Sequence, residues 1–185
     1  AADKVPKDLK GDVTCNHSAI KNQYILESSV LTCSSAFDWF RRNFYENYTY
    51  EELNKIIEKV PAGANSVLCV PYFQGHAAPD WNSQARGVFS NITLHTKKED
   101  LLRALLEGIC YEIANGLDVL KSYVEVQEVW VNGGLAGSEA FNMIQCDVYG
   151  MELARRGKTD ATARGALMVA LCACGICETV ADAFE

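Results

Sequence analysis

The sequence predicts a single α/β domain in which helices cover a sheet. Segments rich in β-forming residues alternate with stretches whose apolar residues recur at helical spacing, which is typical of this class. The chain has 185 residues, 49% of them hydrophobic, which is enough to bury one core without disulfide bridges or metals. No internal repeat or low-complexity segment divides it, so we expect one domain over residues 1–185.

The first segment, residues 1–23, is polar and weakly patterned, and we expect an edge hairpin around residues 10–12. A strand is predicted over residues 23–26. Residues 28–43 predict a helix, because serines that favour a helix N-cap open this stretch and its apolar residues fall on one side.

A second helix is predicted directly after Thr49. Thr49 and Glu52 have the spacing of a capping box, and an amphipathic stretch follows them. Pro61 closes this helix, because proline cannot continue a helix interior. Residues 65–70 then form a short run of β type that ends at Pro71.

The loop over residues 71–87 has about seventeen residues, and a compact domain rarely keeps an ordered loop of that length without a use. Its side chains could face a ligand or another domain. They could equally pin a surface loop through Trp81 and Tyr72, so both interpretations stay open. The polar and aromatic residues concerned are His76, Asp80, Trp81, Asn82 and Arg86.

A long helix is predicted over residues 97–123, with Thr96 as its cap. Its leucines and isoleucines form a wide apolar face that suits a helix lying on a sheet. Glu107 and Glu112 fall among these apolar positions. We expect each carboxylate to be solvated or hydrogen-bonded in a structural role.

The last third of the chain continues the alternation. Residues 124–131 predict a strand, residues 138–149 a helix and residues 151–154 a brief strand. A final helix is expected over residues 159–177. Small residues in this helix would permit close packing against a neighbour, namely Gly165, Ala166, Ala170 and Ala173.

Gly133 and Gly134 separate the predicted strand from the predicted helix in the stretch VWVNGGLAGSEAFNMIQCDVYG. Adjacent glycines let the backbone approach a ligand, and the following helix N-terminus offers partial positive charge to a phosphate. This turn also lies at the carboxyl end of a strand, where α/β proteins bind ligands. A nucleotide site is therefore one interpretation. The other is a purely steric turn, since the spacing matches neither G-x-G-x-x-G nor a P-loop.

The charge balance disfavours two kinds of partner. Asp and Glu number 24 against 17 Lys and Arg, a formal net charge of -7, and no basic cluster exceeds two adjacent residues. Binding to nucleic acid or to an anionic membrane through bulk charge is therefore not expected. No apolar run is long enough to cross a membrane, and the N-terminal residues carry no secretion signal, so we expect a cytoplasmic protein.

The cysteines are expected to be reduced thiols in that setting. Cys174 and Cys177 form a C-x-x-C pair, but no second pair stands at zinc-ligand spacing, so a thiol or metal-binding function is the least favoured interpretation. Other cysteines lie in apolar periodic segments, where a free thiol behaves as a small hydrophobe; these are Cys33, Cys69, Cys110, Cys146 and Cys172.

Five segments, taken in order, resemble the C-terminal domain of the FGGY carbohydrate kinases, the group that includes glycerol kinase, xylulokinase and gluconokinase. They begin with YILESSVLTCSSAFDWFRR and VPYFQGHAAPDWNSQARGVF and occupy residues 24–42, 70–89, 100–113, 131–150 and 159–171. The resemblance implies an actin-like ATPase (RNase H-like) fold with a mixed sheet covered by helices, lacking the N-terminal hairpin of the domain. It also implies transfer of the γ-phosphoryl group of ATP, with Mg²⁺, to a hydroxyl of a sugar or polyol.

The resemblance also implies roles for individual residues. The nucleotide would contact Gly133, Gly134, Ser138, Ser34 and Asp38. The cleft between two domains would be lined from residues 73–87 by Asp80, Asn82 and Arg86. The chain departs from the family pattern where Asn132 replaces the usual Asp and where Ser34 and Asn91 replace Gly.

The family's catalytic base belongs to the N-terminal half of the full enzyme, in a motif that this sequence lacks. We therefore expect no catalytic residue in this chain, no metal ligand, and no activity from the chain alone. The sugar or polyol would be held by the missing domain, and the full-length enzyme could form a homodimer. The alternative hypothesis is a non-catalytic actin-like module that binds nucleotide or regulates another protein.

Overall fold

The computed structural model describes residues 2–155 and 160–184. The elements follow one another as β1 (Thr14–His17), β2 (Tyr24–Glu27), α1 (Ser34–Phe44), α2 (Tyr50–Lys59), η1 (Ala64–Ser66), β3 (Leu68–Val70), β4 (Val88–Ser90), α3 (Lys98–Lys121), β5 (Val129–Trp130), η2 (Gly134–Gly137), α4 (Glu139–Tyr149), β6 (Leu153–Ala154), α5 (Ala161–Ala173) and η3 (Asp182–Phe184). Strands thus alternate with helices, as the sequence pattern predicted.

The described strands pair two by two, in both orientations. β1 and β2 are antiparallel, as are β3 and β4, whereas β5 and β6 are parallel. The strands predicted over residues 124–131 and 151–154 are present in shortened form as β5 and β6. Their parallel pairing brings Trp130 opposite Ala154, at the point where the chain enters the glycine turn.

The N-terminal hairpin turns over residues 18–23, so the expectation of a hairpin around residues 10–12 was wrong. Its turn closes where the Ser18 N–H donates to the Gln23 carbonyl at 2.9 Å. The preceding segment instead pairs with β2, because the backbones of Ala2 and Tyr24 exchange hydrogen bonds of 2.8 Å. That pairing leaves residues 10–12 in a connecting bend.

Helix α1 begins at Ser34, not at residue 28 as the serine-rich sequence predicted. Residues 28–33 remain non-helical between β2 and α1. The side chain of Ser28 lies against Gly116 of α3, where an added Cβ would stand 2.7 Å from the Ser28 hydroxyl oxygen. This tertiary contact holds the segment against α3 and overrides the capping preference of serine.

Helix α3 begins after Lys97, so Thr96 is not its cap. The buried Asp100 carboxylate accepts the Lys97 N–H at 2.8 Å and thereby satisfies the helix start. The Thr96 hydroxyl oxygen instead accepts the Thr93 N–H at 2.9 Å, which closes the preceding turn. A carboxylate in the first turn is also favoured by the helix dipole.

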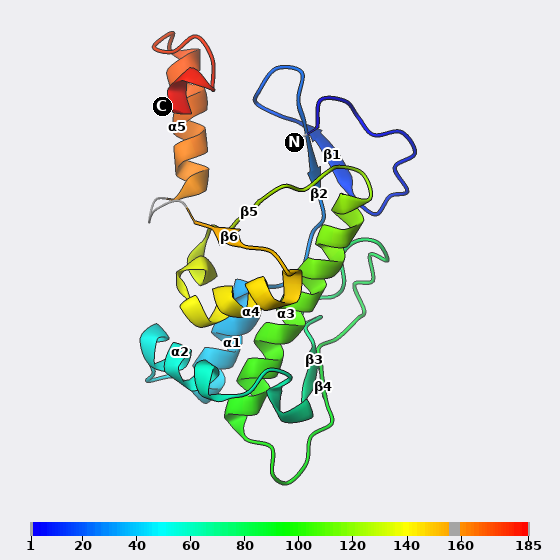
Figure 1. The fold of residues 1–185 in the computed structure, drawn as a ribbon, viewed down its shortest axis with the longest axis vertical. Helices are drawn as coiled ribbons and strands as arrows, with labels where there is room; N and C mark the ends of the chain where they lie inside the picture. The colour runs from blue at the N-terminus through cyan, green and yellow to red at the C-terminus, as the bar shows by residue number, and fades with distance from the viewer. Residues whose placement is uncertain (1, 156–159, 185) are drawn as a thin grey trace.

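The core is built around α3. This helix packs against β3, α4, α1 and α2, and Figure 1 shows α1 and α4 on one side of it with β3 and β4 on the other. The predicted apolar face is buried, since Leu102, Leu105 and Ile109 are each 0% exposed. Both carboxylates expected in structural roles are hydrogen-bonded. Glu107 accepts the Gly63 N–H at 3.0 Å, and Glu112 accepts the Tyr72 hydroxyl at 2.9 Å.

Helix α5 is capped by Asp160, whose carboxylate accepts the Thr162 N–H at 2.9 Å. Residue 159, where the sequence placed the start of this helix, lies outside the described residues. The helix packs on η3 and buries none of its residues, and Figure 1 shows it apart from α3 and α4. Its small residues Gly165, Ala166, Ala170 and Ala173 are therefore exposed. Strands β5 and β6 have only two residues each, so they provide little sheet surface against which a helix could pack.

None of the helices in residues 2–155 and 160–184 has the length and apolar character needed to cross a bilayer.

Candidate functional site

A cavity of about 340 Å³ lies where three helices begin. Ser34 opens α1, Tyr50 opens α2 and Ser138 is the N-cap of α4, and all three residues line this cavity. Helix N-termini carry partial positive charge from their aligned peptide dipoles. Their convergence makes this cavity suitable for an anionic group such as a phosphate.

The glycine turn forms one wall of the cavity. Gly133 has φ 93°, a left-handed conformation that glycine adopts without strain, and Gly134 to Gly137 form η2. A Cβ added at Gly133, Gly134 or Gly137 would meet no atom within 4 Å. The space beside the turn is therefore open, so a ligand can approach the backbone there.

Ser138 connects the turn to two helices. Its hydroxyl donates to the side-chain oxygen Oδ1 of Asn54 on α2 at 2.5 Å and accepts the Phe141 N–H at 3.2 Å. Ser138 is 8% exposed, so its hydroxyl is satisfied by these two protein groups in a buried position. These contacts orient η2 and α4 relative to α2. No local pattern in the sequence points to Asn54, because its hydrogen-bond partner Ser138 lies 84 residues further along the chain.

Asp38 provides the carboxylate of the cavity. Its Oδ1 accepts the Tyr50 hydroxyl at 3.0 Å, and the Nε of Arg41 lies 3.8 Å from the same oxygen. The Arg41 guanidinium also lies 5.4 Å from the centre of the Tyr50 ring. Burial, followed by the hydrogen bond to Asp38, raises the pKa of the Tyr50 hydroxyl. The sequence gives one indication that Tyr50 lines the cavity, namely its position next to Thr49, the N-cap of α2.

The structure brings together four of the five residues that the resemblance assigned to the nucleotide. Ser34, Asp38, Gly134 and Ser138 line one cavity, and Gly133 directly precedes its glycine wall. Apolar side chains complete the lining, notably Phe37 and Leu135, which are 3% and 6% exposed. The cavity thus combines positive helix ends with an apolar wall.

The three residues assigned to the cleft loop do not line this cavity. Asp80 Oδ2 lies 3.5 Å from His76 Nδ1, and Asn82 Oδ1 accepts the Gln84 N–H at 2.9 Å. Arg86 donates to the carbonyl oxygens of Ser83 and Ala85, at 2.9 and 2.8 Å. These contacts are local and shape the loop itself.

The loop is anchored on α3 through Tyr72 and His76. Both contact Glu112, the hydroxyl of Tyr72 at 2.9 Å and the Nε2 of His76 at 3.5 Å. Burial, with the hydrogen bond to Glu112, raises the pKa of Tyr72 to about 12. Tyr72 therefore pins the loop as the sequence suggested, whereas Trp81 is 57% exposed.

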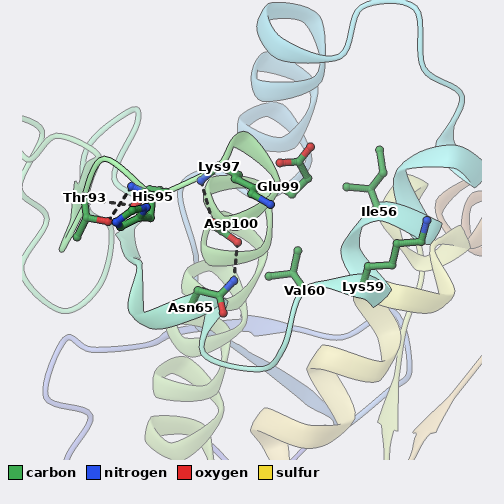
Figure 2. A pocket seen from close by; sticks show the side chains of 10 residues that line it. Ile56, Lys59, Val60, Asn65, Thr93, His95, Lys97, Glu99 and Asp100 are labelled. Atoms are coloured by element: carbon green, nitrogen blue, oxygen red, sulfur yellow. Dashed lines mark hydrogen bonds between the residues drawn. The ribbon is translucent and has the colours of Figure 1, made fainter.

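A second cavity, of about 420 Å³, lies between the end of α2, η1 and the start of α3. Figure 2 shows its Asp100 carboxylate bonded to the Asn65 side chain and to the Lys97 backbone, each at 2.8 Å. Lys59 and Glu99 add side chains of opposite charge to its lining. Its one buried carboxylate, that of Asp100, is engaged by these two hydrogen bonds within the protein.

Within residues 2–155 and 160–184 no group of three or more His, Cys, Asp or Glu side chains could hold a metal ion. All eight cysteines are free thiols, including Cys174, which is exposed, and Cys177. Burial raises the pKa of Cys33 to about 11 and that of Cys69 to about 12, so these two thiols are poor nucleophiles.

Residues 4–174 match the family model described as "FGGY family of carbohydrate kinases, C-terminal domain". Glycerol kinase of Streptococcus uberis is 32% identical over 160 residues, covering 85% of this chain and 32% of that protein. Glycerol kinase of Rhodopirellula baltica is 32% identical over 179 residues, covering 96% of this chain and 33% of that protein. The chain thus spans about a third of the length of these curated relatives.

Solved structures of similar proteins agree with this match. Plasmodium falciparum glycerol kinase with ADP has a TM-score of 0.78 and 27% identity, covering 96% of this chain and 36% of that one. Xylulose kinase of Bifidobacterium adolescentis has a TM-score of 0.71 and 27% identity, covering 84% of this chain and 30% of that one. A kinase from Brucella ovis, at 20% identity and TM-score 0.83, supports the fold alone.

The fold is therefore that of an actin-like ATPase domain. The chain belongs to the FGGY family of carbohydrate kinases, and it corresponds to the C-terminal domain of that family.

Proposed function

We propose that this chain is the ATP-binding part of a carbohydrate kinase, which transfers the γ-phosphoryl group of ATP to a hydroxyl of a sugar or polyol. The observation that carries the proposal is the convergence of three helix N-termini and an open glycine turn on one cavity. The volume of about 340 Å³ lies in the range of small-molecule sites.

The two kinds of wall suit the two ends of a nucleotide. The phosphates lie beside Gly133 and Gly134, where the backbone is open and the α4 N-terminus supplies positive potential. The base packs on the apolar side chains of Phe37 and Leu135, with Asp38 beside it. Ser138 positions the glycine turn through its hydrogen bonds to α2 and α4. This positioning does not require the ligand, because both partners belong to the protein.

Phosphoryl transfer depends on positioning, charge neutralisation and a base near the acceptor hydroxyl. Asp38 is the one carboxylate among the described residues that line the cavity, and its Oδ1 is engaged by Tyr50. Among the described residues, no group of three or more His, Cys, Asp or Glu side chains could hold a metal ion. We therefore propose that this chain binds nucleotide but does not turn it over alone.

Calorimetric titration of the 185-residue chain with MgADP tests the binding. The expected dissociation constant is on the order of micromolar to millimolar, as for a weak single site. Gly134→Val should abolish the heat, because its side chain enters the open space without meeting protein atoms. Gly165→Val, at an equally open glycine on α5, is the matched control and should bind as the unmodified chain does.

The same protein should release no ADP from ATP in the presence of glycerol, xylulose or gluconate. Turnover above background would refute the proposal that this chain binds nucleotide without catalysing phosphoryl transfer alone. A regulatory module that has lost the nucleotide site would give no heat with MgADP, which separates that alternative from the kinase hypothesis.

A further inference from the structure

We propose that His76 is a proton-dependent latch, which holds the loop over residues 71–87 against α3 when its imidazole is protonated and loosens the loop when the imidazole is neutral. The latch consists of His76, the loop carboxylate Asp80 and the α3 carboxylate Glu112. None of these three residues lines the helix-start cavity, so this inference does not depend on the proposed nucleotide site.

Both ring nitrogens of His76 face a carboxylate. Nδ1 lies 3.5 Å from Oδ2 of Asp80, within the loop, and Nε2 lies 3.5 Å from Oε2 of Glu112, on α3. The imidazole therefore bridges the loop and the helix. Among residues 2–155 and 160–184, His76 is the only basic side chain within ion-pair distance of either carboxylate.

The charge of the imidazole decides whether both contacts are favourable. Imidazolium carries a positive charge and an N–H on each nitrogen, so it attracts both carboxylates. Neutral imidazole has one N–H and one lone pair, so one of its nitrogens then turns a lone pair toward a negative oxygen. Loss of the proton to solvent thus weakens one contact and makes the other repulsive. Histidine is the side chain that changes charge between about pH 5 and 8.

The cluster is sheltered enough for this change to matter. The side chains of His76 and Glu112 are each 16% exposed, so salt screens their contact less than it screens a surface pair. The Tyr72 ring packs on the imidazole with 4.5 Å between ring centres, and its hydroxyl donates to Glu112 Oε1 at 2.9 Å. Burial, with this hydrogen bond, raises the pKa of Tyr72 to about 12, so Tyr72 keeps its proton wherever histidines titrate.

The latch acts on a turn that is closed on itself. The His76 N–H donates to the Asn82 carbonyl at 2.9 Å, and the Trp81 N–H donates to the Ala77 carbonyl at 2.8 Å. A Cβ added at Gly75 would stand 3.0 Å from the same Asn82 oxygen, so the two ends of the turn touch. The His76 side chain joins this turn to α3. Its release should expose the backbone hydrogen bonds of the turn to solvent.

The experiment is hydrogen–deuterium exchange of the 185-residue chain at pH 5.5 and pH 8.5, measured by mass spectrometry on a peptide that covers residues 72–87. Dividing the intrinsic exchange rate at each pH by the measured rate gives a protection factor. This factor should be roughly tenfold higher at pH 5.5, the order expected for loss of a charge-assisted contact. A peptide from the core of α3, residues 101–110, is the internal reference for global stability and should change less.

Four variants identify the group responsible. His76→Gln should bring the ratio of the two protection factors to about one, because it removes the titrating group. Glu112→Gln should have nearly the same effect, because it removes the sheltered carboxylate. Asp80→Asn should reduce the ratio only in part, since the Asp80 side chain is 73% exposed and its contact is screened more. His95→Gln, at an exposed histidine outside the loop, is the matched control and should keep the ratio of the unmodified chain.

A ratio near one in the unmodified chain would overturn this inference. So would a ratio that His76→Gln leaves unchanged, or an equal ratio in the reference peptide from α3. If His76→Gln does not fold, as judged by circular dichroism, Glu112→Gln and the unmodified chain decide the question, and equal ratios in these two proteins would overturn the latch.

Discussion

Gly108 on α3 lies against the backbone carbonyl of Cys69 on β3, so close that a Cβ on Gly108 would overlap the carbonyl oxygen. At this point the long helix rests directly on the strand, with Leu105 and Ile109 buried on either side of the glycine. The contact fixes the position of α3. Because α4 packs on α3, it also fixes the position of the cavity.

Gly108→Ala should destabilise the domain, because a backbone carbonyl cannot move aside as a flexible side chain can. Overpacking of this kind costs about 1–3 kcal/mol or more. Gly165→Ala is the matched control, since that helical glycine has open space around it and alanine favours helix by up to ~1 kcal/mol. The measurement is urea unfolding followed by circular dichroism. Equal midpoints for the two variants would contradict the contact.

Glu107→Ala should be strongly destabilising. Glu107 is 5% exposed, and its carboxylate accepts the Gly63 N–H at 3.0 Å and pairs with the Nε of Arg103 at 2.6 Å. Removing one partner of a buried pair leaves an unpaired charge and costs about 3–5 kcal/mol. Glu51→Ala, at the exposed pair with Lys55, should leave the unfolding midpoint within experimental error. A similar small effect at Glu107 would show that its pair is solvated.

Stability should fall as the pH rises above about 9. Burial raises the pKa of Cys33 from 9.0 to about 11 and that of Cys69 from 9.0 to about 12. Their folded pKa values exceed the unfolded ones, so this stabilisation is fully present below pH 9. It is lost as the pH rises toward 12, because only the unfolded chain then releases these protons.

The check is the urea midpoint at pH 8 and at pH 10.5 in the same salt, with a lower midpoint expected at the higher pH. Cys69→Ala should make this decrease smaller, because the buried thiol no longer contributes. Cys174→Ala, at an exposed thiol, should leave the decrease unchanged. A urea midpoint that does not vary between pH 8 and pH 10.5 would refute the raised pKa values of Cys33 and Cys69.

Thr49→Ala should cost about 1 kcal/mol, the usual value of a helix N-cap. Its hydroxyl accepts the Glu52 N–H at 3.2 Å, and the Glu52 carboxylate accepts the Thr49 N–H at 2.8 Å. Thr96→Ala should cost less, because Asp100 already satisfies the start of α3. Thermal unfolding of both variants measures the difference. If Thr96→Ala proved the more damaging change, the cap predicted from sequence would be the real one.

Several local predictions from sequence are confirmed. α2 has the capping box of Thr49 and Glu52, and α4 (Glu139–Tyr149) matches the helix predicted over residues 138–149, with Ser138 as its N-cap. Each depends on residues within one helical turn, so neighbours in the chain suffice to specify it. The predictions for residue 28 and for Thr96 failed. In the first, packing of Ser28 against α3 overrode a local preference, and in the second, the buried Asp100 satisfied the helix start.

The sequence by itself determined the family, the alternation of strands and helices, and the glycine turn before α4, because order along the chain and local spacing specify these features. Only the tertiary structure decided that three helix starts meet at one cavity and that Tyr50 holds Asp38 there. The bond of Ser138 to Asn54 joins residues 84 positions apart. Such contacts depend on how whole helices pack, and no local pattern encodes that packing.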